Sequence, residues 1–164
     1  MKTIPLPITG RSGGRNGVCV GYALVDVDDF DRCSEHKWNL HPLGYVSNYE
    51  VGLLHRFILN TPRWHDTDHI DRNKLNNSKS NLRFATNSRN HANSKKYRTY
   101  KGVKTSSKYK GVTWSKVRKL WQAQIRQHNR FIYLGVFKTQ KAAARAYNEA
   151  AIKRFKTFAN LNKV

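Results

Sequence analysis

The sequence is short of acidic residues, of cysteines and of long apolar stretches, and each shortage excludes a class of protein. Two cysteines in 164 residues, Cys19 and Cys33, are too few for a disulfide framework. Apolar runs stay well below the roughly 18–20 residues that a membrane helix needs. Residues 1–14 contain prolines and lack the sustained apolar stretch of a secretion signal. We therefore expect an intracellular protein with no membrane partner.

The shortage of acidic charge points to a polyanionic partner. Thirty-one Lys and Arg stand against ten Asp and Glu, which gives a net charge of +21 at pH 7 and an isoelectric point of about 10.4. Residues 1–93 contain 12 basic and 9 acidic side chains, for +3, whereas residues 94–164 contain 19 basic side chains and only Glu149, for +18. Nucleic acid is the commonest partner of so basic a chain; a ribosome-associated or merely solubilising charge is the alternative. The uneven distribution indicates two modules, of which the second grips phosphate.

The C-terminal module begins with a strand pattern. Residues 120–126 alternate apolar and polar side chains, which places Ala123 and Ile125 on one face and Gln124 and Arg126 on the other. A second apolar run at 131–137 follows a short polar loop, and a shorter candidate strand at 110–115 precedes both. Three consecutive strands with short connections predict an antiparallel sheet.

A helical pattern follows these strands. Residues 139–155 change to helical periodicity, with Thr139 as a suitable N-cap and a stripe of small residues at Ala143, Ala146 and Ala150. Small residues let a helix lie close against a sheet. We therefore expect a three-stranded antiparallel sheet packed on one helix, within an α+β protein.

The blocks YKGVTW, WQAQIR, YLGVF, AARAYNEAA and FANLN, in this order over residues 107–162, resemble the APETALA/ethylene-response-factor DNA-binding domain. The resemblance implies that the sheet lies in the major groove of double-stranded DNA and reads bases with its exposed face. Thr113 and Ser115 stand where that family has arginines, so a preference for GC-rich sites does not carry over. The readers and neighbouring contacts that the resemblance implies are Lys110, Thr113, Ser115, Lys116, Gln124, Arg126, Arg130 and Tyr133.

A basic segment without hydrophobic periodicity, residues 94–107, precedes this domain and is interpreted as a linker that orders on DNA. Lys95, Lys96 and Arg98 are expected to contact phosphates there. The tetrapeptide YKGV occurs twice, at 100–103 and 109–112, and the second copy opens the domain.

The central stretch, residues 66–94, has a composition that favours ligands over regular structure. It holds three aspartates, two histidines and seven asparagines in 29 residues. Phosphodiester hydrolysis needs a base for the attacking water and a cation on the phosphate, and a hard cation prefers oxygen ligands. Asp68 and His69 offer a ligand and a base, and Asn90 offers an amide oxygen on a short helix capped by Thr86. Asn81 is placed to pin the intervening loop through hydrogen bonds to backbone.

The pattern DHID…LNN…SNLRFATNSRN, from Asp68 to Asn90, resembles the HNH nucleases, in particular their phage and intron-encoded members. The resemblance implies that His69 is the general base, that Asp68 and Asn90 hold a divalent metal, and that Asn81 is the structural asparagine of the catalytic motif. The metal would be Mg2+, with Mn2+ possible, and the product ends 5′-phosphate and 3′-hydroxyl. Arg72 stands where the family usually has glycine and is expected to contact phosphate. Upstream blocks extend the resemblance over nearly the whole chain.

Together these patterns predict an HNH module at 1–93 with a ββα-metal core at about 64–93, a linker at 94–107 and a DNA-binding domain at 108–164. The predicted function is a site-specific, homing-type DNA endonuclease acting in the host cytoplasm of a phage or bacterium. It would act as a monomer or a dimer on DNA, without a small-molecule cofactor. The alternatives are a non-catalytic DNA-binding regulator with a relic HNH fold and a structural RNA- or ribosome-binding protein.

Several histidines, cysteines and tryptophans outside the motif have plainer interpretations. His55 is expected to be a hydrogen-bonded structural histidine, and Trp38 and Trp64 are expected in the core. His65 and His91 flank the motif and are minor candidates for approaching the metal or DNA. A zinc site is a less favoured alternative, because its spacing is only loosely finger-like; its ligands would be Cys19, Cys33, His36 and His41.

Overall fold

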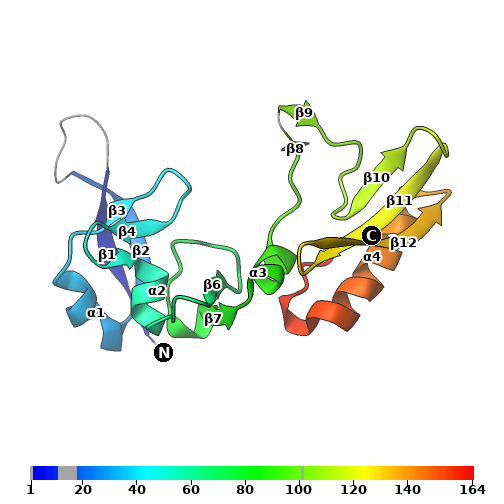
Figure 1. Cartoon of the computed structure of the whole chain (residues 1–164). Helices are drawn as coiled ribbons and strands as arrows, with labels where there is room; N and C mark the ends of the chain where they lie inside the picture. Colours follow the sequence, from blue (N-terminus) through cyan, green and yellow to red (C-terminus); the bar gives the residue numbers. More distant parts are fainter. Residues whose placement is uncertain (1, 11–17, 101) are drawn as a thin grey trace. The chain divides into compact units, whose positions relative to one another are not determined.

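The computed structural model describes residues 2–10, 18–100 and 102–164, and it divides the chain into two compact units, Met1–Ala85 and Thr86–Val164. Both units combine helices and strands, which confirms the α+β class (Figure 1). In the part of the chain that the structure describes, helices are too short or too polar to cross a membrane.

The N-terminal unit is built on a five-stranded sheet in the order β2-β1-β3-β4-β5. The two long strands β1 and β2 pair antiparallel, and β3 runs parallel to β1. Short helices α1 (Val27–Ser34) and α2 (Leu54–Leu59) complete the unit. The strands are β1 (Thr3–Thr9), β2 (Cys19–Asp26), β3 (Asn39–Leu40), β4 (Val46–Asn48) and β5 (Gly52–Leu53).

The core of this unit gathers apolar side chains from β1, β2 and both helices around Trp38. Trp38 is 1% exposed and donates from Nε1 to the carbonyl of Cys33 at 2.7 Å, so its predicted core position is confirmed. The same prediction for Trp64 is wrong. Trp64 lies in the turn before the next strand and is 81% exposed.

A separate two-stranded hairpin, β6 (Asp66–His69) and β7 (Leu82–Ala85), carries the central motif. Between its strands run a loop and a 3-10 turn, η1 (Lys79–Asn81). The loop is anchored on β2, because Leu24 donates to the Leu75 carbonyl at 2.7 Å and accepts from the Asn77 amide at 2.8 Å. The edge of the large sheet therefore supports the loop that faces the candidate site.

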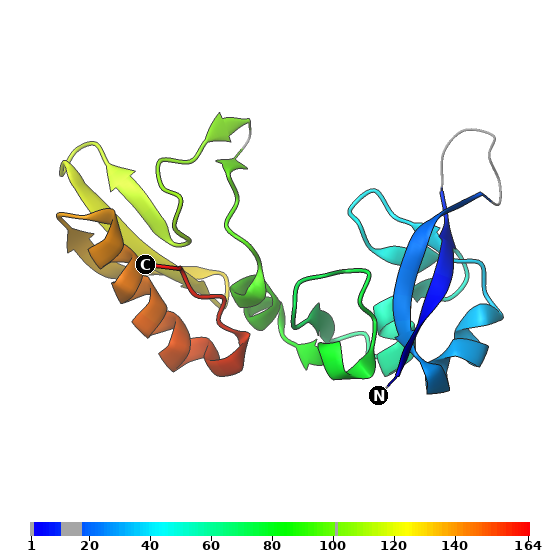
Figure 2. The same ribbon diagram turned by 180° about the vertical axis from the view of Figure 1, so that it is seen from behind.

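The C-terminal unit holds a three-stranded antiparallel sheet, β10-β11-β12, with the long helix α4 along one face, as predicted (Figures 1 and 2). Thr139 caps α4 as expected, accepting from the Ala142 amide at 3.1 Å. At the first copy of the repeated tetrapeptide, β8 and β9 pair antiparallel. The elements are α3 (Asn87–Asn93), β8 (Thr99–Tyr100), β9 (Val103–Lys104), β10 (Val112–Ser115), β11 (Leu120–Gln127), β12 (Arg130–Phe137), α4 (Gln140–Phe155) and η2 (Lys156–Phe158).

A bulge in β12 interrupts the alternation of the sheet. Ala123 pairs with Gly135 but Gln124 pairs with Tyr133, so Leu134 is the extra residue. The bulge reverses which face later side chains occupy, and Phe137 packs in the core cluster with Ala123. Beyond the bulge, a simple alternation read from the sequence fails for this reason.

Candidate active site

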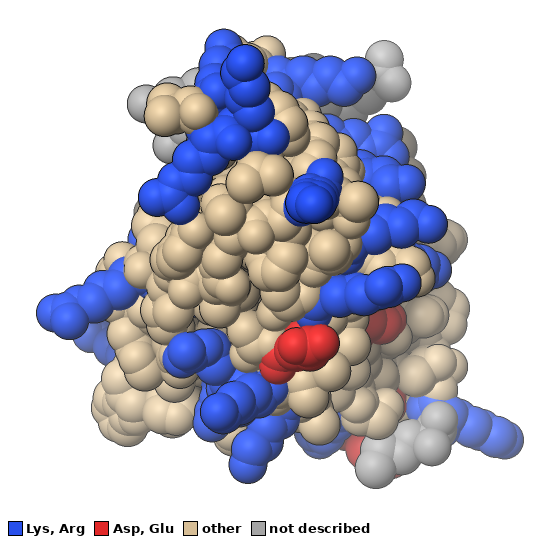
Figure 3. Space-filling view, turned by 90° about the vertical axis from the view of Figure 1, so that its right-hand side faces the viewer, with Lys and Arg blue, Asp and Glu red and all other residues tan. Residues whose placement is uncertain are grey.

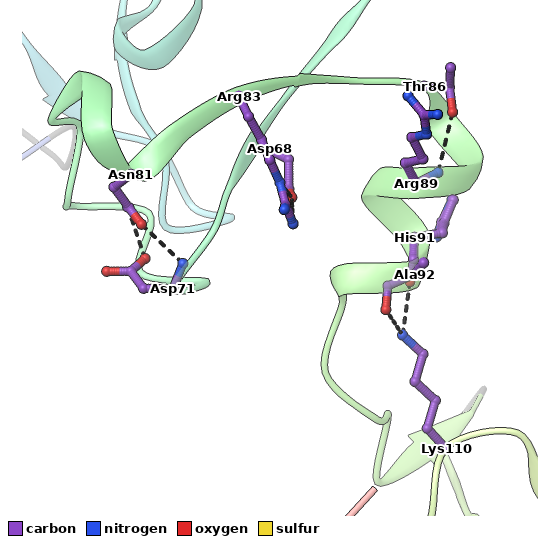
Figure 4. Close-up of polar contacts among 9 residues, drawn as sticks. All are labelled: Asp68, Asp71, Asn81, Arg83, Thr86, Arg89, His91, Ala92 and Lys110. Carbon is purple, nitrogen blue, oxygen red and sulfur yellow. Dashed lines mark hydrogen bonds and ion pairs between the residues drawn. The ribbon is translucent and has the colours of Figure 1, made fainter. Parts of the chain in front are cut away.

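A buried ion pair joins the two strands of the β6–β7 hairpin (Figure 4). Asp68 on β6 lies opposite Arg83 on β7, and Asp68 is only 4% exposed. Arg83 donates from Nε to Oδ2 of Asp68 at 2.8 Å, and its Nη2 lies 2.7 Å from the same oxygen. A buried carboxylate needs such compensation, because leaving water is costly for a charge. Arg83, which the sequence patterns did not predict as part of the site, is thus the partner of the buried Asp68 carboxylate.

His69, the next residue on β6, is buried and oriented by Asn77 from the loop. Its Nε2 lies 3.2 Å from Oδ1 of Asn77. Nδ2 of Asn77 donates to the Lys74 carbonyl at 3.3 Å, which fixes the amide with Oδ1 toward His69. Because Oδ1 can only accept, Nε2 of the neutral ring carries the proton and Nδ1 keeps the lone pair.

The surroundings also keep the His69 ring neutral. Burial lowers the pKa of His69 and outweighs the hydrogen bond to Asn77 and the carboxylates of Asp71 and Asp68, which raise it. At pH 7 the imidazole is therefore unprotonated, and its basic atom is Nδ1. This is the state that a general base must have before it takes a proton.

Two further rings, Tyr45 and His55, pack around His69. The His55 and His69 centroids lie 4.9 Å apart with planes at 69°, and the Tyr45 ring lies 6.3 Å from His69. Burial, with a smaller effect of His69, lowers the pKa of His55 to about 3. Among the described residues nothing bonds to the buried Nδ1 of His55, and the hydrogen bond expected of this histidine stays a prediction. His55 is a packing partner of the candidate base.

Lys74 packs against this group of side chains. Its Nζ lies 3.9 Å from the Tyr45 ring centroid and donates to the Leu43 carbonyl at 2.7 Å. Burial raises the pKa of Tyr45, and the carboxylates of Asp68 and Asp66 add to this effect. Tyr45 and Lys74 were not predicted, because nothing in their local sequence pattern connects them with the motif.

Asn81 pins the loop as the sequence predicted (Figure 4). Its Oδ1 accepts from the Asp71 amide at 3.0 Å, and its Nδ2 donates to Oδ1 of Asp71 at 2.9 Å and to the Asn76 carbonyl at 2.7 Å. Burial would raise the pKa of Asp71, but hydrogen bonds from Asn73, Asn76 and Asn81 outweigh it and lower the pKa. The asparagine-rich composition therefore serves to hold a loop that has little regular structure.

Arg72 occupies the turn of this loop with φ of 65° and is exposed. A positive φ is the conformation that glycine adopts most easily, which explains why the HNH pattern usually has glycine there. Arg72 tolerates that geometry here. Its contact with phosphate remains a prediction.

Asn90 lies on α3, in the C-terminal unit, whereas Asp68 and His69 lie in the N-terminal unit. Thr86 caps α3 as expected, accepting from the Arg89 amide at 3.4 Å (Figure 4). His91, on the same helix, is exposed. His65 packs edge-on against Phe84 with ring centroids 6.0 Å apart.

The strand residues of the predicted DNA-reading set lie on the sheet face opposite α4: Thr113, Ser115, Gln124, Arg126 and Tyr133. Arg126 donates to Oδ1 of Asn129 at 3.0 Å, and its guanidinium lies 5.7 Å from the Phe131 ring centroid. Arg118, which the sequence analysis did not name, donates to the Tyr133 hydroxyl at 2.8 Å. The exposed members of the predicted set are Thr113, Lys116, Arg126, Arg130 and Tyr133, and the half-buried ones are Lys110, Ser115 and Gln124.

Two lysines of the linker and residues of this sheet face line the same groove, of about 310 Å3, in the C-terminal unit. Lys95 and Lys96 line it together with Thr113, Gln124 and Arg126. Burial lowers the pKa of Lys96. Figure 3, a view from the side of β10–β12 and α4, shows Lys and Arg spread over the surface with few acidic groups. Arg98 is exposed. Lys110 differs from the other residues predicted to contact DNA, because its ammonium donates to carbonyls at the end of α3.

The donor chemistry in the N-terminal unit fits a hard divalent cation. Asp68, on the same strand as His69, supplies a carboxylate, and oxygen ligands suit Mg2+ better than zinc. Within the described ranges, no three His, Cys, Asp or Glu side chains are grouped as a metal site. Cys33 is buried in the core and Cys19 is exposed on β2.

Several known proteins are similar in sequence to this chain. A protein of Acanthamoeba polyphaga mimivirus described as an uncharacterized HNH endonuclease is 33% identical over 151 residues, or 87% of this chain and 75% of that protein. APETALA2-like protein 2 of Oryza sativa subsp. indica is 48% identical over 48 residues, 29% of this chain but 11% of its own length. Protein 3.8 of Escherichia phage T7 is 36% identical over 72 residues, 42% of this chain and 55% of that protein. No protein-family model and no solved structure matches the chain.

The long match establishes the class: the chain belongs to the HNH endonuclease family. The chain also contains an APETALA2-like segment, as the shorter matches indicate. Both resemblances seen in the sequence are thereby confirmed.

Proposed function

We propose that this protein is a site-specific, homing-type endonuclease that hydrolyses double-stranded DNA with a divalent metal. The observation that carries the proposal is the state of His69, a buried, neutral imidazole whose Nε2 proton is committed to Asn77. Its Nδ1 is then the basic atom of the ring, and the strand that carries it also carries the Asp68 carboxylate, which is paired with Arg83. Family membership supports the same assignment.

In this proposal His69 takes the proton of the attacking water at Nδ1. Asp68 and Asn90 are the proposed ligands of Mg2+ or Mn2+, which when bound would polarise the scissile phosphate and stabilise the leaving oxygen. Asn81 keeps the loop in shape, so that Asn77 stays in contact with His69. The expected product ends are a 5′-phosphate and a 3′-hydroxyl.

The C-terminal unit is proposed to select the site on DNA. The similarity to APETALA2-like proteins and the net charge of residues 94–164 support this role. Arg126 is suited to a bidentate contact with guanine and Gln124 to adenine. Lys95, Lys96, Arg98 and Arg72 are proposed to contact phosphates.

Cleavage of supercoiled plasmid and phage genomic DNA tests the proposal. The unmodified chain, His69→Ala and Asp68→Asn are compared with Mg2+, with Mn2+ and with EDTA, and Asp31→Asn on the exposed side of α1 is the matched control. We expect cleavage only with metal, a loss of about 10²- to 10⁴-fold in His69→Ala, and normal activity in Asp31→Asn. Relaxed product indicates nicking by a monomer, and linear product indicates a double cut by a dimer or two events.

Two results would contradict the proposed nuclease function. If no variant cuts DNA while all bind it tightly, the protein is a DNA-binding regulator with a relic HNH fold. Stronger binding to duplex RNA than to duplex DNA would instead favour the RNA-binding alternative.

A further inference from the structure

Lys110 holds the C-terminal end of helix α3 (Figure 4). Its Nζ donates to the backbone carbonyls of His91 at 2.9 Å, Ala92 at 2.7 Å and Ser94 at 2.7 Å. A lysine ammonium has three N–H donors, and three carbonyls here accept from it. Carbonyls at a helix C-terminus lack intrahelical donors and carry partial negative charge, so a cation is stabilising there.

Other contacts fasten α3 to the same unit. Asn160 donates from its backbone amide to the Ala92 carbonyl at 3.2 Å and from Nδ2 to the Ser94 carbonyl at 3.0 Å. At the other end of the helix, the amide of His128 in the β11–β12 turn donates to Oγ of Ser88 at 2.7 Å. The Ala92 side chain is buried in the core cluster beneath the sheet.

The length of α3 makes these contacts decisive. A helix of seven residues, Asn87–Asn93, cannot hold its conformation alone, because isolated helices below about 12–15 residues are marginal in water. Tertiary contacts must therefore fix the backbone of α3. Lys110, the only cation in these contacts among the described hydrogen bonds, supplies charge-assisted bonds, which are the stronger kind.

We infer that Lys110 is a positioning residue that clamps α3 to the DNA-reading domain and thereby sets the proposed metal ligand Asn90. This inference rests on the proposed function and departs from the resemblance, which makes Lys110 a DNA contact. The domain that docks on DNA then carries the ligand helix with it as one body. A single substitution at Lys110 should therefore weaken metal binding without weakening DNA binding.

Lys110→Met in the full chain tests the clamp, since methionine keeps an apolar stem and removes the ammonium. We expect cleavage to fall about 10- to 100-fold and the Mg2+ or Mn2+ concentration for half-maximal cleavage to rise, as for other supports of metal ligands. Affinity for a duplex target should match that of Lys108→Met, an exposed lysine two positions away that removes the same charge. Hydrogen exchange of the α3 amides should become roughly tenfold faster or more, because charge-assisted bonds are lost.

Asn160→Ala removes the side-chain bond to Ser94 and no formal charge, so it should change α3 exchange and metal requirement in the same direction, by less. A tenfold or larger loss of DNA affinity in Lys110→Met relative to Lys108→Met, with unchanged α3 exchange, would overturn the inference and make Lys110 a DNA reader. Unchanged cleavage, metal requirement and exchange would also overturn it. If the unmodified chain does not cut DNA, the proposed function fails, while α3 exchange and DNA affinity still decide the clamp.

Discussion

Asn77 determines which nitrogen of His69 is basic, although the two residues are eight positions apart in the chain. The Asn77 amide is itself oriented by the Lys74 carbonyl, so the tautomer of the ring depends on the loop conformation. Orienting partners of this kind decide whether a histidine presents a lone pair or a proton to its substrate. The asparagine-rich motif thus sets the tautomer of His69 in addition to shaping the loop.

At this scale we expect Asn77→Leu to lower the cleavage rate about tenfold or more, because the ring loses the acceptor that fixes its tautomer. DNA affinity should stay within about twofold, since the substitution removes no charge. Single-turnover cleavage and fluorescence anisotropy with a labelled duplex measure the two quantities. Equal losses in cleavage and affinity would contradict the orienting role.

His55 gives the N-terminal unit a pH-dependent stability. Burial lowers its folded pKa to about 3 from the ordinary value of 6.5, so below pH 6.5 the unfolded chain binds a proton that the folded chain does not bind. Stability is therefore full above pH 6.5 and falls as the pH drops toward 3, by at most about 1.4 kcal/mol per pH unit for this group. The pKa of His69 is also lowered by burial and adds to the same trend.

Urea unfolding at pH 7.5, 6.5 and 5.5 measures this slope. His55→Phe keeps an aromatic ring without a titrating group and should flatten the fall between pH 6.5 and 5.5. An unchanged slope in His55→Phe would show that other groups cause it.

At the scale of elements, the repeated YKGV tetrapeptide shows how identical sequence meets different packing. Gly102 and Gly111 both have positive φ, 78° and 74°. A Cβ on Gly102 would meet nothing within 4 Å, whereas one on Gly111 would overlap the Tyr147 ring and lie 2.5 Å from the Gln124 carbonyl oxygen. The second glycine lets the start of the domain pass close to α4 and β11.

We expect Gly111→Ala to destabilise the C-terminal unit by about 3 kcal/mol or more, combining a left-handed backbone with overpacking. Gly102→Ala carries only the backbone cost, about 1 kcal/mol, and is the matched control. Thermal or urea unfolding compares the two variants. Equal effects would show that the Tyr147 contact relaxes without cost.

At the scale of the whole molecule, charge and chemistry are divided between the units. Residues 1–85 carry 11 basic and 9 acidic side chains, and residues 86–164 carry 20 basic and one acidic, so +2 and +19 sum to +21. We therefore expect counterion release on DNA binding to come mainly from the C-terminal unit. The N-terminal unit, with its buried Asp68 and neutral His69, contributes little net charge.

We expect the salt dependence of DNA affinity to follow this division. Replacing Lys95 and Lys96 by Gln should reduce the slope of log K against log[salt] by about 2, since each lost phosphate contact removes about 0.9. Lys2→Gln with Lys37→Gln, two lysines of the N-terminal unit, should leave the slope nearly unchanged. Anisotropy titrations between about 50 and 300 mM salt compare the two double variants. Equal slopes for both pairs would contradict the division of charge between the units.

Much of the fold was predictable because its signals are local. Alternation in residues 120–126, the Thr139 cap and the Thr86 cap each depend on neighbours in sequence, and the structure confirms them. The hydrogen bonds of Asn81 also followed from spacing along one loop. Phe137 was not predictable, because the bulge at Leu134 that turns it inward depends on pairing with β11.

By itself the sequence determined the α+β class, the charge division and the motif containing Asp68, His69 and Asn81, since composition and short-range spacing encode these features. Only the tertiary structure decided that Arg83 compensates Asp68, that Tyr45 and His55 enclose His69, and that Lys110 is committed to α3. These side chains meet through strand pairing and core packing between distant segments. Such contacts form only when the chain has folded, and no local pattern specifies them.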